Sequence, residues 1–569
     1  MTDRRLRPEA WWWLATAAAF AGGAALRLYH LPAQVLLGDE IHAVRAVLSI
    51  PLPEILVTYR ITDYCLPLAG LARFVLERGG TLSELDFRWP VVASGLLLLA
   101  AAPLVARRLA SPRAAFVYPW LLAISPGLVL YSRIARSYAP ASLLALAAVG
   151  AFFAWWRTGR RRYGAAYAVL GALAVWFSLV VGPLVAAALA FGVLAVLGRR
   201  WSTRSSREPE RARDRRVGRP GWLGLVLVGL ALAAGLACFL VPGWESLQQV
   251  LAAKPGRGEL RLASVLSALQ LLAGTTRPLV AVLFWLLAAR GLARLASRDR
   301  AAALFGAFLV AAQCAALAVT TPFGLANPVV LARYLVVALP IVLLWVAHGL
   351  EVPERWSLSL RRPELARAAA GGAAALLLVL LVATGPFALP RFRYSSFVHH
   401  DDFLAYHRPL PRLRVDRIPA FYRDLAPGSG GRVEAILELP TYPEGDNRAV
   451  HRYQDRHRRQ VLVSTPTPDL NDRRLAFRTR VVPQPGPILT SGARYLVVHR
   501  DLEAEELAVE LPPGVPRGWN RRQQNLSAHF RRVGTATAER LTAAWGPPDW
   551  QDSQVVVWDL GRVRGLAPE

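Results

Sequence analysis

Two adjacent carboxylates, Asp39 and Glu40, stand in the segment LLGDEIHAVRA, shortly after the first long apolar run. A carboxylate at a membrane surface can accept the proton of an attacking hydroxyl, and burial beside lipid raises a carboxyl pKa toward the range that this task requires. A plainer interpretation is also open, in which Asp39 caps the helix IHAVRAVLS and Glu40 stabilises its first turn, by about 1 kcal/mol. The hypothesis to test is that Asp39 is a general base with Glu40 beside it.

Two later segments combine arginine with tyrosine. SPGLVLYSRIARSYAP contains Arg133, Arg136 and Tyr138, and GLANPVVLARYLVVALP contains Arg333 and Tyr334. The guanidinium group is a planar fork of donors that suits phosphate oxygens, so these arginines are candidates for binding a phosphate or diphosphate. The alternative is that they reach for lipid headgroups at the membrane surface.

Further candidates lie between the carboxylate pair and the second apolar run. We include Asp63 and Arg88 in the predicted site, and treat His42 as a neighbour of the pair and not as a ligand. Each of them, taken alone, also fits a helix cap, a surface ion pair or an interfacial anchor. Adjacent carboxylates on a loop supply too few ligands to define a metal site, so the metal stays unknown and a divalent cation is allowed but not required.

The elements that position these residues are membrane spans. The chain has 569 residues, of which 54% are hydrophobic, and a single soluble domain cannot bury so much apolar surface. A spanning helix needs about 20 mostly apolar residues, and such runs recur, for example at 11–28, 222–241 and 301–319. The first run is followed by the charged segment GDEIHAVR and not by a cleavage site, which indicates a retained span in a lipid bilayer.

The net charge of +28 is concentrated in linkers between apolar runs, which is typical of cytoplasmic loops and argues against nucleic-acid binding. With the arginine-rich linkers inside, the N-terminus is cytoplasmic and residues 29–88 form an external loop. The expected localisation is the cell (inner) membrane, crossed about eleven times. The predicted spans lie near residues 11–28, 89–106, 114–130, 139–156, 163–181, 184–198, 221–241, 275–293, 301–320, 335–350 and 368–389.

The character of the chain changes after Pro390. Segments such as VEAILEL, RYLVVH and QVVVWDL have the composition of strands, and the remaining length of about 180 residues is typical of one domain. The sequence therefore predicts a polytopic α-helical membrane domain over residues 1–390 and a soluble α/β domain over residues 391–569. By alternation of the spans, this second domain is extracytoplasmic.

The order of the motifs resembles the GT-C superfamily of membrane glycosyltransferases, particularly bacterial members related to protein O-mannosyltransferases and to the aminoarabinose transferase of lipid A. The resemblance covers roughly residues 10–350 and depends on four elements in combination. They are Asp39-Glu40, Arg88-Trp89-Pro90, YSRIARSY at 131–138 and RYLVVALP at 333–340. Relatives often have Gln-Glu where this chain has Arg133-Ile134, so this chain lacks the carboxylate found at that position in relatives.

The resemblance implies an enzyme that moves a sugar from a polyprenyl-phosphate carrier to an extracytoplasmic lipid, glycan or protein acceptor, with inversion at the anomeric carbon. Asp39 would act as the base, Glu40 would support it, and Arg136 and Arg333 would bind the lipid phosphate. A transporter or flippase of a lipid-linked or polar substrate is the main alternative, although no repeated halves are visible. A catalytically inactive envelope-assembly protein is the other.

Overall fold

The computed structural model describes residues 8–29, 31, 40, 43, 46–47, 50–59, 65–79, 84–108, 110–205, 220–253, 260–322, 325–351, 363–388, 412–413, 418–427, 434–440, 453, 456–459, 461–462, 485–489, 491–507, 509–510 and 521–566. The chain divides into two compact units. We call the first, Met1–Tyr29, His42–Phe74 and Arg88–Thr384, the helical unit. The second, His30–Ile41, Val75–Phe87 and Gly385–Glu569, is the sheet unit.

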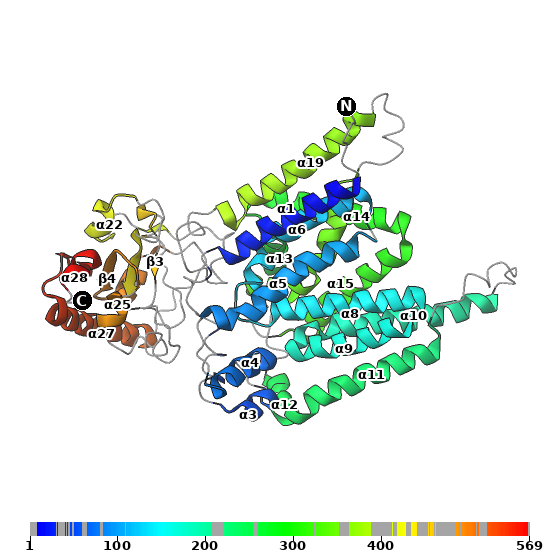
Figure 1. Ribbon diagram of the computed structural model, residues 1–569, viewed down its shortest axis with the longest axis horizontal. Helices are drawn as coiled ribbons and strands as arrows, with labels where there is room; N and C mark the ends of the chain where they lie inside the picture. Colours follow the sequence, from blue (N-terminus) through cyan, green and yellow to red (C-terminus); the bar gives the residue numbers. More distant parts are fainter. Residues whose placement is uncertain are drawn as a thin grey trace. The chain divides into compact units, whose positions relative to one another are not determined.

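Helices account for nearly all the described residues up to Ala388 (Figure 1). In chain order they are α1 (Pro8–Leu28), α3 (Leu52–Val57), α4 (Leu66–Glu77), α5 (Glu84–Ala106), α6 (Pro112–Ile124), α7 (Pro126–Tyr131), α8 (Tyr138–Thr158), α9 (Arg161–Phe177), α10 (Gly182–Ser205), α11 (Trp222–Leu240), α12 (Trp244–Ala253), α13 (Leu262–Ala273), α14 (Pro278–Arg298), α15 (Arg300–Thr320), α16 (Pro328–Leu335), α17 (Leu339–Gly349) and α19 (Pro363–Thr384). Short 3-10 turns adjoin some of them: η2 (Leu179–Val181), η5 (Val241–Gly243), η6 (Val336–Ala338) and η7 (Pro386–Ala388).

Each of the eleven predicted spans overlaps a helix, and the described residues are mostly helical. Among the described residues, seven helical stretches are long and apolar enough to cross a membrane: Leu85–Ala106, Tyr138–Thr158, Leu179–Gly198, Trp222–Ala252, Pro278–Arg298, Arg300–Thr320 and Pro328–Gly349. The count of about eleven spans stays a prediction. The predicted helix 114–130 is broken at Ser125, whose backbone is extended, because proline at the next position disfavours helical dihedrals in the residue before it.

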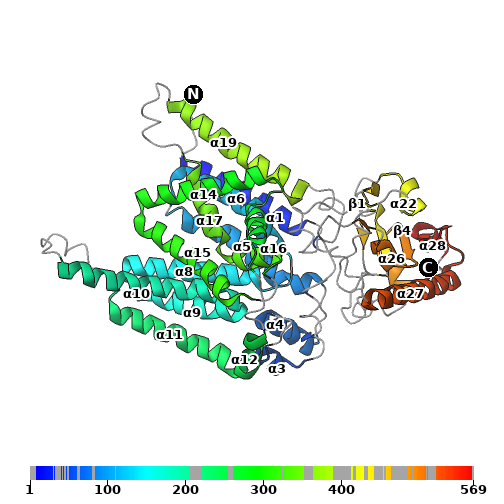
Figure 2. The ribbon, with the colours of Figure 1, turned by 180° about the vertical axis from the view of Figure 1, so that it is seen from behind.

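The long helices of the helical unit pack in two groups. Helices α8, α9, α10 and α11 lie side by side in both views (Figures 1 and 2). Phe152 of α8 stacks on Phe305 of α15, with 5.9 Å between the ring centroids. In the second group, α17 packs between α14 and α6. These contacts fix where the helix ends meet.

The crossing of α14 and α17 is made by backbone against backbone. A methyl group added at Gly291 would lie 1.7 Å from the carbonyl oxygen of Trp345, and one at Gly349 would lie 2.1 Å from that of Leu287. Real carbon atoms cannot approach an oxygen so closely, so any larger residue at either position forces the two helices apart.

We expect Gly291→Ala to lower the stability of the folded protein by about 1–3 kcal/mol, because it overpacks this crossing. The thermal midpoint of the purified protein in detergent measures the loss. Gly372→Ala is the matched control, since a methyl group there meets nothing within 4 Å and alanine favours the helix. Equal midpoints for the two variants would contradict the crossing geometry.

The sheet unit contains a five-stranded mixed sheet in the order β3-β2-β4-β7-β6. Strands β3 (Val461–Leu462), β2 (Ile436–Leu439) and β4 (Tyr495–His499) are parallel, whereas β7 (Val555–Asp559) is antiparallel to β4 and to β6 (Trp550–Gln551). A separate antiparallel pair joins β1 (Arg412–Leu413) and β5 (Val509–Glu510). The unit's helices are α22 (Ala420–Asp424), α25 (Pro485–Leu489), α26 (Leu502–Leu507), α27 (Arg521–Trp545) and α28 (Leu560–Leu566). Strands β2, β4 and β7 lie within the three segments predicted as strands.

Both faces of the sheet are buried at β2, β4 and β7, which explains why the sequences of these strands are mostly apolar and do not alternate with polar residues. Successive side chains alternate between faces. One face packs Leu437, Leu496 and Trp558 against α27 and α28, and the other packs Ile436 and Val497 against Tyr422 and Tyr453.

A polar network interrupts the second face. His499 lies between two carboxylates, with 2.6 Å from its Nε2 to Glu438 and 2.9 Å from its Nδ1 to Glu505. Tyr422 and Tyr453 donate hydrogen bonds to Glu438 and Glu505, respectively. Burial favours the neutral ring of His499, but the charges of Glu505 and Glu438 outweigh it and raise the pKa of His499 from 6.5 to about 10. The network therefore holds an imidazolium.

This network predicts a pH dependence of the sheet unit. Because the pKa of His499 is higher in the folded state, its stabilisation is complete below about pH 6.5 and declines as the pH rises toward about 10. Hydrogen exchange of the β4 amides in the full-length protein, corrected for the intrinsic rate, should show less protection at pH 9.5 than at pH 6.5. His499→Gln should remove most of this difference. Equal protection of wild-type β4 at both pH values would mean that His499 is neutral.

Candidate functional site

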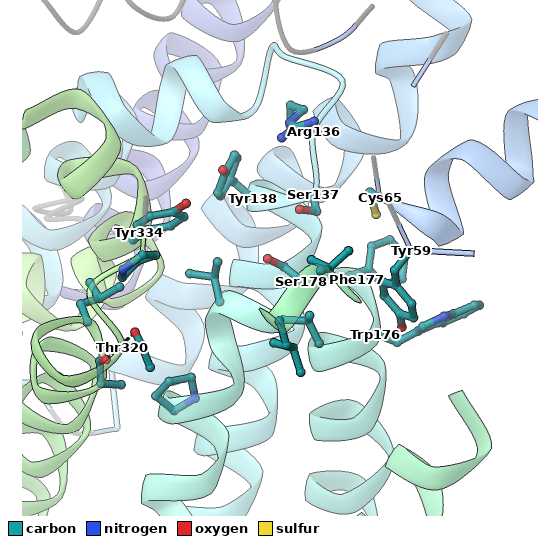
Figure 3. A pocket seen from close by; sticks show the side chains of 18 of the residues that line it. Tyr59, Cys65, Arg136, Ser137, Tyr138, Trp176, Phe177, Ser178, Thr320 and Tyr334 are labelled. Carbon is teal, nitrogen blue, oxygen red and sulfur yellow. Dashed lines mark hydrogen bonds between the residues drawn. The ribbon is translucent and has the colours of Figure 1, made fainter. Parts of the chain in front are cut away.

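A pocket of about 280 Å³ lies within the helical unit, where several helix ends meet. Its walls come from the start of α8, the end of α9, η2 and the start of α10, the end of α15 and the end of α16 (Figure 3). Polar groups on the wall are few and come from separate segments. They include Tyr59, Arg136, Tyr138, Ser178, Gln313 and Tyr334.

The segment between α7 and α8 carries Arg136 into this wall. It is buried and non-helical, and its bends are fixed by hydrogen bonds to neighbouring helices. Ser132 donates to the carbonyl of Leu128 at 2.6 Å, and Arg133 Nη1 donates to the carbonyl of Leu26 at 2.8 Å. Helix α8 then starts at Tyr138, directly after Arg136 and Ser137. Arg136 therefore lies just before the start of α8, in a segment that these hydrogen bonds connect to α1 and α7.

The burial of another arginine, Arg27, has a structural explanation. Arg27 lies in the last turn of α1 and donates to the carbonyl oxygens of Leu122 and Ala123, both at 3.3 Å. These two carbonyls belong to the last turn of α6, which has no partners within its own helix. Arg27 thus closes the end of α6, and its burial needs no ligand.

The electrostatics of the pocket favour an anion. Among the described residues that line it, Arg136 alone carries a charge, and that side chain is only 9% exposed. Tyr138 lines the same pocket, and its ring centroid lies 4.7 Å from that of Tyr131. A guanidinium in apolar surroundings gains more from an anionic ligand than it would in water.

The structure brings together three of the residues predicted from the sequence. Arg136, Tyr138 and Tyr334 come from two distant segments and line the same pocket (Figure 3). Arg333 lies over the ring of Tyr334, 5.8 Å from its centroid, and is not part of the pocket wall.

Arg88 and Arg133 are placed elsewhere. Both are buried, neither lines the pocket, and they are close enough to affect each other electrostatically. Glu40 is buried and belongs to the sheet unit. Asp39, His42 and Asp63 lie outside the described residues. Their part in the site stays a prediction.

No group of three histidine, cysteine or acidic residues that could hold a metal ion occurs in the described part of the chain. Asp39 and Asp63, the acidic candidates, are not in that part. Whether the protein binds a divalent cation is therefore not decided by the described residues.

Three residues of the pocket wall, Tyr59, Trp176 and Gln313, were not predicted as site residues. Gln313 had a signal, because it is a polar residue inside the apolar run 301–319, and polar residues within spans are often functional. Tyr59 and Trp176 had none, since tyrosine and tryptophan are also common at membrane interfaces.

No protein-family model matches the chain, and no curated protein sequence matches it. The chain is similar to solved structures of ArnT from Cupriavidus metallidurans. One, in the apo state, has 15% identity and a TM-score of 0.42 and covers 99% of both chains. The other, bound to undecaprenyl phosphate, has 14% identity and a TM-score of 0.44 and covers 94% of this chain and 79% of that one.

A third similar structure is the archaeal oligosaccharyltransferase AglB from Archaeoglobus fulgidus, in complex with an inhibitory peptide and a dolichol-phosphate. It has 12% identity and a TM-score of 0.39, and covers 92% of this chain and 72% of that chain. ArnT is the lipid A aminoarabinose transferase, and both proteins are GT-C superfamily members.

Proposed function

We propose that this protein is a membrane glycosyltransferase of the GT-C type that takes its sugar from a polyprenyl-phosphate carrier. The observation that carries the proposal is the convergence of Arg136, Tyr138 and Tyr334 on one pocket. The two motifs that contain them are far apart in the sequence, and each contributes to the wall of a pocket in which Arg136 is the one charged side chain among the described residues. That arrangement suits a ligand with a phosphate and an uncharged polar part.

The charge of the linkers supports an extracytoplasmic pocket. Helix α8 starts at the pocket and ends at Thr158, and Arg157 in its last turn forms an ion pair with Asp299 just before α15. Helix α15 then returns to the pocket at Thr320. The arginine-rich linkers at 157–162 and 294–300 therefore lie at the opposite ends of these helices, and such linkers favour the cytoplasm.

In the proposed reaction an acceptor hydroxyl attacks the anomeric carbon from the face opposite the phosphate. The new carbon–oxygen bond forms as the bond to the phosphate oxygen breaks, and the polyprenyl phosphate leaves with that electron pair. Asp39 takes the hydroxyl proton, with Glu40 beside it. Arg136 stabilises the negative charge that develops on the leaving phosphate, and Arg333 is a second candidate for it.

The parts of the chain outside the pocket fit this scheme as follows. We propose that residues 391–569 form an extracytoplasmic domain and that the acceptor is a lipid, a glycan or a protein. Arg88, Arg133, His42 and Asp63 are proposed to shape the surroundings of the donor. We propose that the protein lies in the cell (inner) membrane, with its N-terminus on the cytoplasmic side.

The test of the function is transfer of labelled sugar from membrane-extracted polyprenyl-phosphate donors by the purified full-length protein. We expect labelled acceptor or, in its absence, slow hydrolysis of the donor that depends on the protein. Heat-denatured protein in the same detergent is the control. A folded protein that consumes no donor from the extract would refute the proposal and favour a transporter.

A further inference from the structure

Three residues that line the pocket each have a buried hydrogen-bonding atom with no partner among the described residues. These atoms are the hydroxyl of Tyr59, Nε1 of Trp176 and Oε1 of Gln313. Leaving a buried polar atom unpaired destabilises a protein, so each such atom calls for an explanation. All three in one pocket point to a ligand that pairs with them.

Gln313 defines what that ligand must offer. The residue is fully buried, and its Nε2 donates to the carbonyls of Val180 at 3.0 Å and Tyr334 at 3.1 Å. Both amide hydrogens are thereby used, and the two acceptors fix which end of the amide is the oxygen. Oε1 can only accept, so its partner must be a donor.

The other two atoms have different requirements, and their rings are held in place. Trp176 Nε1 can only donate, and its ring stacks on Phe239 with 4.5 Å between centroids. The hydroxyl of Tyr59 can donate or accept. Its ring lies against Gly243, where an added methyl group would come within 3.0 Å of it. Figure 3 shows Tyr59 and Trp176 close together on one side of the pocket.

One acceptor, one donor and one group of either kind are matched by hydroxyls, because each hydroxyl both donates and accepts. An ionised phosphate only accepts hydrogen bonds, so it would leave Oε1 of Gln313 without a donor. The guanidinium of Arg136 can donate to such a phosphate. The aromatic and apolar remainder of the wall, including Phe177 and Tyr138, is typical of pockets that bind a small organic molecule.

We propose that Tyr59, Trp176 and Gln313 form a hydroxyl subsite that binds the saccharide part of the substrate and determines which sugar is accepted. Arg136 takes the phosphate in the same pocket. The assignment deepens the proposed function and rests on it only for the link between saccharide and phosphate. The subsite itself requires a saccharide and no transfer.

The test measures binding to the full-length protein in detergent, by calorimetry. The probes are ten-carbon prenyl phosphates that carry a hexose or a pentose, and the bare ten-carbon prenyl phosphate. Wild-type protein should bind at least one sugar-bearing probe about tenfold more tightly than the bare one. Tyr59→Phe and Trp176→Phe should each lower the affinity for that sugar-bearing probe about threefold to tenfold. The affinity for the bare prenyl phosphate should stay within about twofold of the wild-type value.

The thermal midpoint without ligand separates this role from a structural one. Tyr59→Phe removes an unpaired buried hydroxyl, so its midpoint should equal or exceed that of the wild type. Tyr167→Phe is the matched control, because its hydroxyl donates to the carbonyl of Val185 at 2.8 Å and does not line the pocket. That variant should lower the midpoint and leave sugar binding unchanged.

Each outcome is decisive. Sugar-bearing probes that all bind no better than the bare prenyl phosphate overturn the subsite, and so does a Tyr59→Phe protein that keeps full preference for the sugar. Sugar-dependent binding that both variants weaken supports the subsite even if the wild type transfers nothing, in which case only the proposed enzyme activity fails.

Discussion

Replacement of Asp39 by asparagine is expected to lower the rate of sugar transfer by about a hundredfold to ten-thousandfold, the usual contribution of a general base. Asparagine has nearly the same size but cannot take the proton that the acceptor hydroxyl must lose. The measurement is the initial rate of labelled-sugar transfer at saturating donor. Donor binding should change little, because the loss occurs in the transition state.

The controls for this variant address folding and location. Glu54→Gln neutralises an exposed carboxylate in the same predicted external segment, and it should retain the wild-type rate within about twofold. The thermal midpoint of the Asp39→Asn protein should match that of the wild type. An Asp39→Asn protein with wild-type turnover would show that the base is another residue, or that the carboxylate is only a helix cap.

Replacement of Arg136 by alanine is expected to lower kcat/KM for the lipid-linked donor by about tenfold to a hundredfold, the usual loss for hydrogen bonds to a charged group. Arg136→Lys keeps the charge without the planar fork and should lose less. The donor concentration dependence of transfer, measured for both variants, gives the comparison.

Arg157→Ala is the matched control for Arg136, because Arg157 is an exposed arginine at the opposite end of α8. It should leave kcat/KM unchanged. Equal losses for alanine and lysine at position 136 would mean that the fork geometry matters and not the charge. An unchanged kcat/KM in Arg136→Ala would place the phosphate outside this pocket.

The helical unit was largely predictable, because an apolar run of about 20 residues must be helical in lipid, where backbone groups find no water. The runs that became α8, α11 and α15 show this directly. Pro126 indicates the break between α6 and α7, but the apolar run continues through it and favoured the prediction of one helix. The predicted spans did not include α13, whose 12 residues are too few to signal a crossing.

Residues of the candidate site were predictable only where they belong to a sequence motif. Arg136, Tyr138 and Tyr334 were identified from two motifs, and the structure places all three on one pocket wall. The same motifs also drew attention to Arg133 and Arg333, which do not line the pocket. Neighbours in sequence point in different directions from a turn or a helix, so a motif cannot say which of its residues faces the ligand.

The sequence by itself determined that the chain is mostly helical and apolar, because hydropathy is a property of each segment alone. It also indicated that arginine and tyrosine side chains belong to the candidate site. The tertiary structure decided which groups remain free for a ligand. Gln313 becomes a pure acceptor only because the carbonyls of Val180 and Tyr334 take its two hydrogens, and Tyr59 and Trp176 reach the same pocket from other segments. Hydrogen-bond partners distant in sequence are set by packing, which local composition does not encode.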